Sequence, residues 1–197
     1  MRVFIGVPLA EDLKDRVVAL QKEIGRSVKM KAVAPENLHW TVKFIGNVDV
    51  SQIEGIKTIL DTLKSSIKPF SITVKGLGGF PDTRRPKIVW LGVAQKGEFV
   101  SLLTNVEKAL SHYGPRVTEH EPHMTIARVK EVADKIGLKK FFEKNANKEL
   151  GEMRIDRLVL FESTLAREGL RNHGFEVVRT KFEGPAYKEL SVTLLGG

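Results

Sequence analysis

His39-Trp40-Thr41-Val42 recurs later in the chain as His123-Met124-Thr125-Ile126. Each copy holds a histidine and a threonine two residues apart in a run of strand-forming residues. Side chains on a strand alternate between its two faces, so the histidine and the threonine of each copy should project from the same face of a sheet. If the two strands face each other across a cleft, the site contains two groups that exchange protons near neutral pH and two neutral hydrogen-bond donors. Such a set of groups suits phosphoryl chemistry without a metal.

The composition is that of an ordinary globular protein. At 197 residues, 42% hydrophobic and 28% charged, the chain is long enough for one large domain or two small, intimately packed lobes. The 32 lysines and arginines exceed the 24 acidic residues, and the net charge of +8 is weak support for a polyanionic partner such as RNA. The absence of cysteine excludes disulfides, thiolate nucleophiles and cysteine-ligated metals. No apolar run approaches the roughly 18 residues of a membrane span, so we expect a cytoplasmic protein without a membrane partner.

Hydrophobic periodicity predicts strands interspersed with amphipathic helices. Strands are expected over residues 2–8, 28–34, 38–45, 70–76 and 87–93, within 116–129, and over 152–163, 174–182 and 189–195. Helices are expected over residues 11–27, from a Ser51–Glu54 capping box to before Pro69, and over 97–113 and 134–146, with a loop over 164–173. The order repeats around each motif without a linker. We therefore expect one domain over residues 1–197, built of two similar lobes with one motif in each.

Several other stretches invite a functional interpretation. The glycine-rich residues 76–79 lack a nucleotide-loop signature, and turn or bulge chemistry is the preferred interpretation. Arg84 and Arg85 either lie in a solvated turn or reach a phosphate backbone, and Trp90 is expected in the core. Strict alternation along the first motif strand puts Lys43 on the face of His39, where it is a candidate for contact with the RNA backbone.

The repeated motif has competing interpretations. A single histidine on a strand is more often a structural residue than a catalyst, but two copies in the same setting favour a shared site. His39, His120 and His123 are candidate zinc ligands, yet no acidic partner accompanies them at helical spacing. No nucleophile-elbow serine is present. In general acid-base chemistry one neutral histidine takes a proton while a second, protonated histidine gives one. Because the two histidines need opposite protonation states, the activity should show a bell-shaped pH dependence. The threonine hydroxyls can bind the phosphoryl oxygens.

The two motifs, His39 to Gly46 and Pro122 to Arg128, resemble those of the two-histidine phosphoesterases, in particular the LigT-like RNA 2′,3′-cyclic phosphodiesterases, also called 2′-5′ RNA ligases. The resemblance covers nearly the whole chain, including the first strand ending at Pro8, Gly78-Gly79-Phe80-Pro81, and Glu162-Ser163-Thr164-Leu165. It implies a bilobal α+β fold with a pseudo-two-fold axis, in which two antiparallel sheets face a basic central cleft and the helices lie outside.

The resemblance also implies an activity and residue roles. The family hydrolyses terminal 2′,3′-cyclic phosphates to 2′-phosphates without a metal, ATP or other cofactor. Carried onto this chain, His39 is the proton donor to the leaving 3′ oxygen, His123 is the proton acceptor from water, and Thr41 and Thr125 hold the phosphate. The same site accepts an RNA 5′-hydroxyl in place of water, which gives a 2′-5′ linkage. The expected partners are RNA ends with a cyclic phosphate, tRNA fragments among them, and the expected state is a monomer.

Arg128 and Phe44 carry over as a phosphate-contacting arginine and as an aromatic lining of the nucleoside pocket. Strict alternation places both on the face opposite their histidines, so this expectation requires a bulge, a twist or entry from a neighbouring strand end. Trp40 is bulkier than the usual residue after the first histidine, and Phe175 replaces a frequent tyrosine. The alternatives are an enzyme acting on other cyclic or 2′-5′ phosphodiesters, a non-catalytic module that binds RNA ends, and a structural interaction protein.

Overall fold

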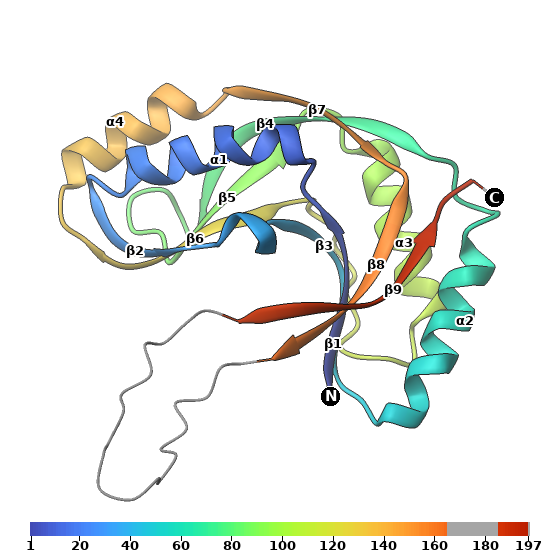
Figure 1. Ribbon diagram of the computed structural model, residues 1–197. Coiled ribbons are helices and arrows are strands. Elements are labelled where there is room, and N and C mark those ends of the chain that lie inside the picture. Colours follow the sequence, from blue (N-terminus) through green and yellow to red (C-terminus); the bar gives the residue numbers. More distant parts are fainter. Residues whose placement is uncertain (165–184, 197) are drawn as a thin grey trace, which may run out of the picture.

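The computed structural model describes residues 1–164 and 185–196 and contains two antiparallel sheets (Figure 1). The predicted strand over 174–182, Phe175 and almost all of the predicted loop over 164–173 lie outside the described residues. The first sheet has the strand order β3-β1-β8-β9, with bounds His39–Asn47, Arg2–Pro8, Arg157–Thr164 and Ala186–Leu194. The second has the order β2-β6-β5-β4-β7, with bounds Val28–Ala32, Met124–Val132, Ile88–Val93, Phe70–Phe80 and Glu149–Ile155.

Within the described ranges, four helices cover the sheets from outside. Helices α1 (Glu11–Ile24) and α4 (Lys135–Asn145) contact β7 and β4 of the second sheet, whereas α2 (Ile53–Leu63) and α3 (Gly97–Ala109) contact β9 and β3 of the first. In Figure 1 these pairs lie at different sides of the molecule, with the two sheets between them. The predicted α+β class, with two antiparallel sheets and external helices, is confirmed. None of the helices in the described ranges is long and apolar enough to cross a membrane.

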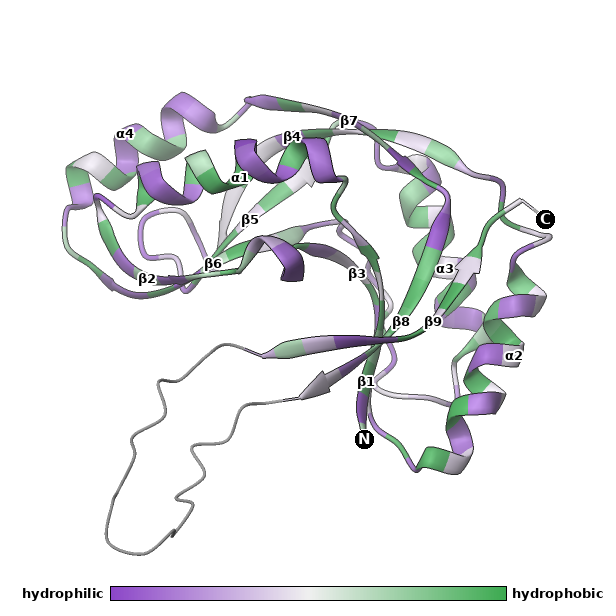
Figure 2. Ribbon diagram, in the orientation of Figure 1, coloured by the Kyte–Doolittle hydropathy of each residue, from purple (hydrophilic) through white to green (hydrophobic). Residues whose placement is uncertain are grey.

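The helices form where the apolar spacing predicted them. In α1 the buried residues include Leu13, Val17, Leu20 and Ile24, which recur every three or four positions and so share one face. Figure 2 shows the same mixture of hydrophobic and hydrophilic segments along the helices. Burying this apolar stripe against the second sheet holds the helix in place, since a helix of this length is marginal on its own.

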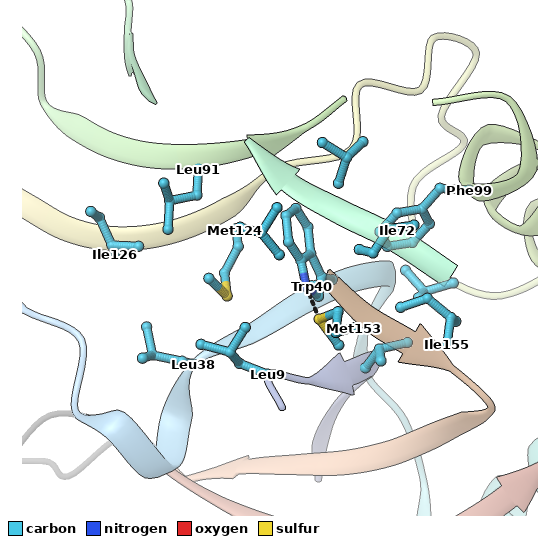
Figure 3. Close-up of a cluster of buried hydrophobic side chains, with 14 of the residues drawn as sticks. Leu9, Leu38, Trp40, Ile72, Leu91, Phe99, Met124, Ile126, Met153 and Ile155 are labelled. Carbon is cyan, nitrogen blue, oxygen red and sulfur yellow. Dashed lines mark hydrogen bonds between the residues drawn. The ribbon is translucent and has the colours of Figure 1, made fainter. Parts of the chain in front are cut away.

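The residues between the histidine and the threonine of each motif meet in the core. Trp40 and Met124 are both fully buried, and Figure 3 shows them in one cluster with side chains from both sheets. The indole Nε1 of Trp40 donates to Sδ of Met153 at 3.4 Å, and its ring packs against Phe99 with centroids 5.6 Å apart. Because neighbouring side chains on a strand point to opposite faces, this anchoring directs the flanking His39 and Thr41 away from the core.

Several predicted boundaries are wrong: α1 ends at Ile24 rather than at residue 27, α3 ends at Ala109 rather than at residue 113, and β4 continues to Phe80. The stretch 152–163 is not one strand, because β7 ends at Ile155 in the second sheet and β8 starts at Arg157 in the first. The capping box is formed by Asp49 and Gln52 rather than by Ser51 and Glu54, and α2 ends at Leu63. The glycine-rich stretch continues β4, and the predicted bulge lies between Val74 and Leu77, where Gly76 adopts a φ of 84°.

Candidate active site

Both motif strands border one cavity of about 780 Å³. The first motif lies on β3 of the first sheet and the second on β6 of the second sheet. The cavity is lined by His39, Thr41, His123 and Thr125, and by residues of β1, β2, β8 and β9. The structure therefore brings together the four residues that the repeated motif singled out.

The first histidine is held by its own strand and by aromatic neighbours. The Asn37 carbonyl lies 2.7 Å from Nδ1 of His39. A carbonyl oxygen can only accept, so Nδ1 donates and the neutral ring keeps Nε2 as its acceptor. That Nε2 lies 3.2 Å from the Thr41 hydroxyl, and the ring packs on Phe4 and edge-on against Tyr187, at centroid distances of 4.7 and 5.2 Å. Burial lowers the pKa of His39 below its ordinary value, although the bond to the Asn37 carbonyl opposes this shift, so the neutral form is favoured.

The second histidine repeats this arrangement. Nδ1 of His123 lies 2.8 Å from the Glu121 carbonyl, which is again the residue two positions before the histidine. Its ring packs edge-on against Phe80 and Trp90, at centroid distances of 5.2 and 6.4 Å. The two copies of the motif thus impose the same tautomer and the same support on both imidazoles. Two such rings on one cavity can take up a proton on one side of a bound group and release one on the other.

A bulge after each threonine changes which residues face the cavity. On β3, Thr41 pairs with Gly6 of β1 while Lys43 pairs with Ile5, so Val42 is the extra residue. The alternation shifts by one position, and Phe44 lines the cavity with a relative exposure of 37%. The conflict between strict alternation and the position of Phe44 is resolved by this bulge.

The second motif strand has the same bulge. Thr125 pairs with Trp90 of β5 while Ala127 pairs with Val89, which leaves Ile126 as the extra residue. Arg128 consequently lines the cavity together with Thr125.

Two sequence predictions are corrected by this register. Lys43 does not share the face of His39: the bulge turns its side chain into the protein interior, where it is 1% exposed and pairs with Glu107 at 2.7 Å. Trp90 is not a core residue, because it pairs with Thr125 and so lies on the cavity face, partly exposed and against His123. Its buried Nε1 finds no hydrogen-bond partner within the described chain.

The cavity is also lined by charged and aromatic residues that the sequence reasoning missed. Arg2 and Lys31 add positive charge to that of the predicted Arg128, against one carboxylate from Glu36 among the described lining residues. Tyr187 joins them from β9. The alternation on β1 offered a signal for Arg2, since Val3, Ile5 and Val7 enter the main core and leave Arg2 and Phe4 on the other face.

The remaining candidates lie away from the cavity. Arg84 and Arg85 are exposed, and their backbone amides donate to the Asp82 carboxylate at 2.7 and 3.0 Å, as in a turn. His120 does not line the cavity. Within residues 1–164 and 185–196 no group of three or more histidine, cysteine, aspartate or glutamate residues is arranged to hold a metal ion.

Comparison with known proteins identifies relatives over the whole chain. The model of the LigT like Phosphoesterase family matches residues 7–90 and again 91–171, so each match contains one His-x-Thr motif. A protein of Methanocaldococcus jannaschii named RNA 2′,3′-cyclic phosphodiesterase is 35% identical, over 86% of this chain and 95% of its own. A protein of the same name from Archaeoglobus fulgidus is 32% identical, over 98% of this chain and 99% of its own. The crystal structure of E. coli LigT complexed with 3′-AMP shares the fold, with a TM-score of 0.75 at 18% identity over 100% of this chain and 98% of that one.

Proposed function

Since the chain belongs to the LigT-like phosphoesterase family, we propose that it is an RNA 2′,3′-cyclic phosphodiesterase that converts terminal cyclic phosphates into 2′-phosphates. The observation that carries this proposal is that two His-x-Thr pairs, one from each sheet, line a single cavity. The names of relatives at 32–35% identity support the substrate class.

In the proposed reaction His123 is the base and His39 is the acid. Water attacks the phosphorus, Nε2 of His123 takes the proton of that water, and the bond from phosphorus to the 3′ oxygen breaks. The leaving oxygen receives the proton on Nε2 of His39, and the product carries a 2′-phosphate and a 3′-hydroxyl. Each Nδ1 keeps its bond to a backbone carbonyl throughout, so the rings need not turn during proton transfer.

The lowered pKa of His39 is compatible with the donor role. Burial disfavours the imidazolium in the free protein, but an anionic phosphate beside the ring favours it when substrate binds. An imidazolium that burial has made more acidic gives up its proton readily to the leaving oxygen. The choice of His39 as acid and His123 as base follows the family resemblance, since the two motifs are nearly symmetric.

The other cavity residues take the roles that the resemblance implies. The hydroxyls of Thr41 and Thr125 donate to non-bridging oxygens, and Arg128 balances the charge that develops on the phosphoryl group. Phe44 supports the terminal nucleoside by stacking. The chemistry uses only these side chains, so we propose that it needs neither metal ion nor ATP. Attack by an RNA 5′-hydroxyl in place of water would give 2′-5′ ligation, the reverse of cleavage of that linkage.

An assay with an oligonucleotide that ends in a 2′,3′-cyclic phosphate, in excess chelator, tests the proposal. We expect conversion to the 2′-phosphate, and about 10²- to 10⁴-fold slower turnover in His39→Ala and in His123→Ala. His112→Ala is the matched control, because His112 is exposed and outside the cavity lining. Unchanged turnover in both site variants, or a 3′-phosphate product, would contradict the assigned roles.

The same experiment separates the alternative function. A non-catalytic module that binds RNA ends would bind the oligonucleotide tightly and with strong salt dependence, yet form no product. A monomeric state, a cytoplasmic location and a single domain over residues 1–197 stay predictions.

A further inference from the structure

Strand β1 presents a row of residues to the cavity at regular spacing. Gly6 pairs with Thr41, and a Cβ at Gly6 would lie 3.2 Å from Cδ2 of His39. Phe4, two residues earlier, packs on the His39 ring, and Arg2, two residues earlier again, lines the same cavity. Residues two apart on a strand share a face, so Arg2 lies at the outer end of a row that starts beside the reaction centre.

The guanidinium of Arg2 is held over an aromatic ring. Its Cζ lies 5.0 Å from the centroid of Phe44, three residues beyond Thr41 on β3. At about 3.3 Å per residue Phe44 lies up to about 10 Å along the strand from Thr41, so this contact holds Arg2 towards the outer end of the cavity. The ring occupies one face of the guanidinium and leaves its in-plane N–H donors available. A prepositioned arginine of this kind suits recognition of a second phosphate.

No carboxylate of the described residues neutralises this arginine. The ion pairs within residues 1–164 and 185–196 include neither Arg2 nor Arg128, although both line the cavity. Tyr187 packs beside the first motif, with its ring 5.0 Å from Phe4 and 5.2 Å from His39. Burial raises the pKa of the Tyr187 phenol and the charges of Arg128 and Arg2 oppose this shift, so the phenol stays a donor and both guanidinium groups act on it.

We propose that Arg2 and Tyr187 form a second anion subsite, which binds the internucleotide phosphate on the 5′ side of the terminal nucleoside. The inference rests on the proposed function, because it takes the cyclic phosphate to lie between His39 and His123. An RNA chain whose last phosphate lies there carries its next phosphate one nucleotide further along. The subsite makes oligoribonucleotide ends better substrates than free cyclic mononucleotides, which lack that second phosphate.

The test compares two substrates that differ by this phosphate and the adenosine attached to it. These are 2′,3′-cyclic AMP and the dinucleotide ApA with a 2′,3′-cyclic phosphate end, and the quantity measured is the ratio of their kcat/KM values. We expect the unmodified protein to favour the dinucleotide. Arg2→Met should lower the ratio about tenfold or more, the usual loss for a charge-assisted hydrogen bond, while Arg2→Lys should keep part of it. Tyr187→Phe should lower it less, since only a neutral hydroxyl is lost.

Controls separate this inference from the proposed function. Arg157→Met removes an exposed arginine of β8 outside the cavity lining and should leave the ratio unchanged. If Arg2→Met lowers kcat/KM equally on both substrates, Arg2 acts at the reacting phosphate. If it lowers kcat/KM on neither, Arg2 binds no phosphate. Either result overturns the subsite. If neither substrate turns over, the proposed function fails, and Kd values for 2′-AMP and for ApA 2′-phosphate still decide the inference. The subsite then predicts that Arg2→Met weakens only the dinucleotide, and equal weakening overturns it.

Discussion

Replacing Lys43 with methionine removes the ammonium group from a buried ion pair and tests the corrected position of this residue. Nζ of Lys43 donates to the Glu107 carboxylate at 2.7 Å, and the two side chains are 1% and 11% exposed. Glu107 belongs to α3 and also accepts from the backbone N–H of Val117 at 3.3 Å, six residues before His123. The pair therefore links the first motif strand to the segment that leads into the second motif.

The magnitude follows from the burial of both charges. Removing one partner of a buried pair leaves the other charge without compensation, which costs about 3–5 kcal/mol. The cost of Lys43→Met should lie near the lower end of this range, since Glu107 keeps its hydrogen bond from the Val117 amide and some exposure to water. Glu107→Met should cost more, because it leaves the more deeply buried ammonium alone. The double variant should recover most of this loss, as a well-packed apolar pair is often no less stable than a buried ion pair.

Urea denaturation at pH 7, followed by circular dichroism, gives the four free energies of unfolding for a double-mutant cycle. A cost below about 1 kcal/mol in both single variants would refute the buried pair. If Lys43→Met kept full stability and instead weakened RNA binding, the original expectation of an RNA contact would be restored.

The pair should also respond to acid. Burial raises the pKa of Glu107, but the bonds from Lys43 and the Val117 amide outweigh it and leave the pKa below its ordinary value. A carboxyl group with a depressed folded-state pKa stabilises the protein fully above its unfolded value, about 4.3, and loses this contribution as pH falls through the folded value. The stability difference between the unmodified protein and Glu107→Met should therefore shrink below about pH 4. A difference that stays constant down to pH 2 would contradict this assignment.

Three further outcomes test the site and its support. Trp40→Ala should lower the free energy of unfolding by about 3–5 kcal/mol in the same urea assay, because the indole is fully buried. A cost below about 1 kcal/mol would contradict the burial of the indole. Gly78→Ala puts a Cβ into the Trp90 ring, which packs on His123, so it should cost about 1–3 kcal/mol and slow turnover, whereas unchanged values would contradict the packing. In NMR titration of the free protein the His39 ring should titrate below about 6.5, and its contribution to stability should be lost as pH falls through that lowered pKa; a midpoint above 6.5 would contradict the burial of the ring.

Much of this architecture was predictable because it depends on local periodicity. The spacing of Leu13, Val17 and Leu20 defines one helical face whatever it packs against, and α1 formed there. The two His-x-Thr strands were predictable for the same reason, since an apolar residue between two polar ones directs both polar groups to one face. Trp40 and Met124 are that apolar residue in each copy, and both are fully buried.

What periodicity could not predict depends on pairing between distant strands. A bulge exists only relative to a partner strand, so Val42 and Ile126 look like ordinary strand residues until β1 and β5 are placed beside them. That one extra residue puts Phe44 and Arg128 at the cavity and turns Lys43 into the interior. The break between β7 and β8, where the chain leaves the second sheet for the first, could not be predicted either, because both segments show the same apolar pattern. The sequence by itself therefore determined the two histidines and the face they share with their threonines, while the tertiary structure decided which residues beyond each threonine join them, since register is set by the neighbouring strand.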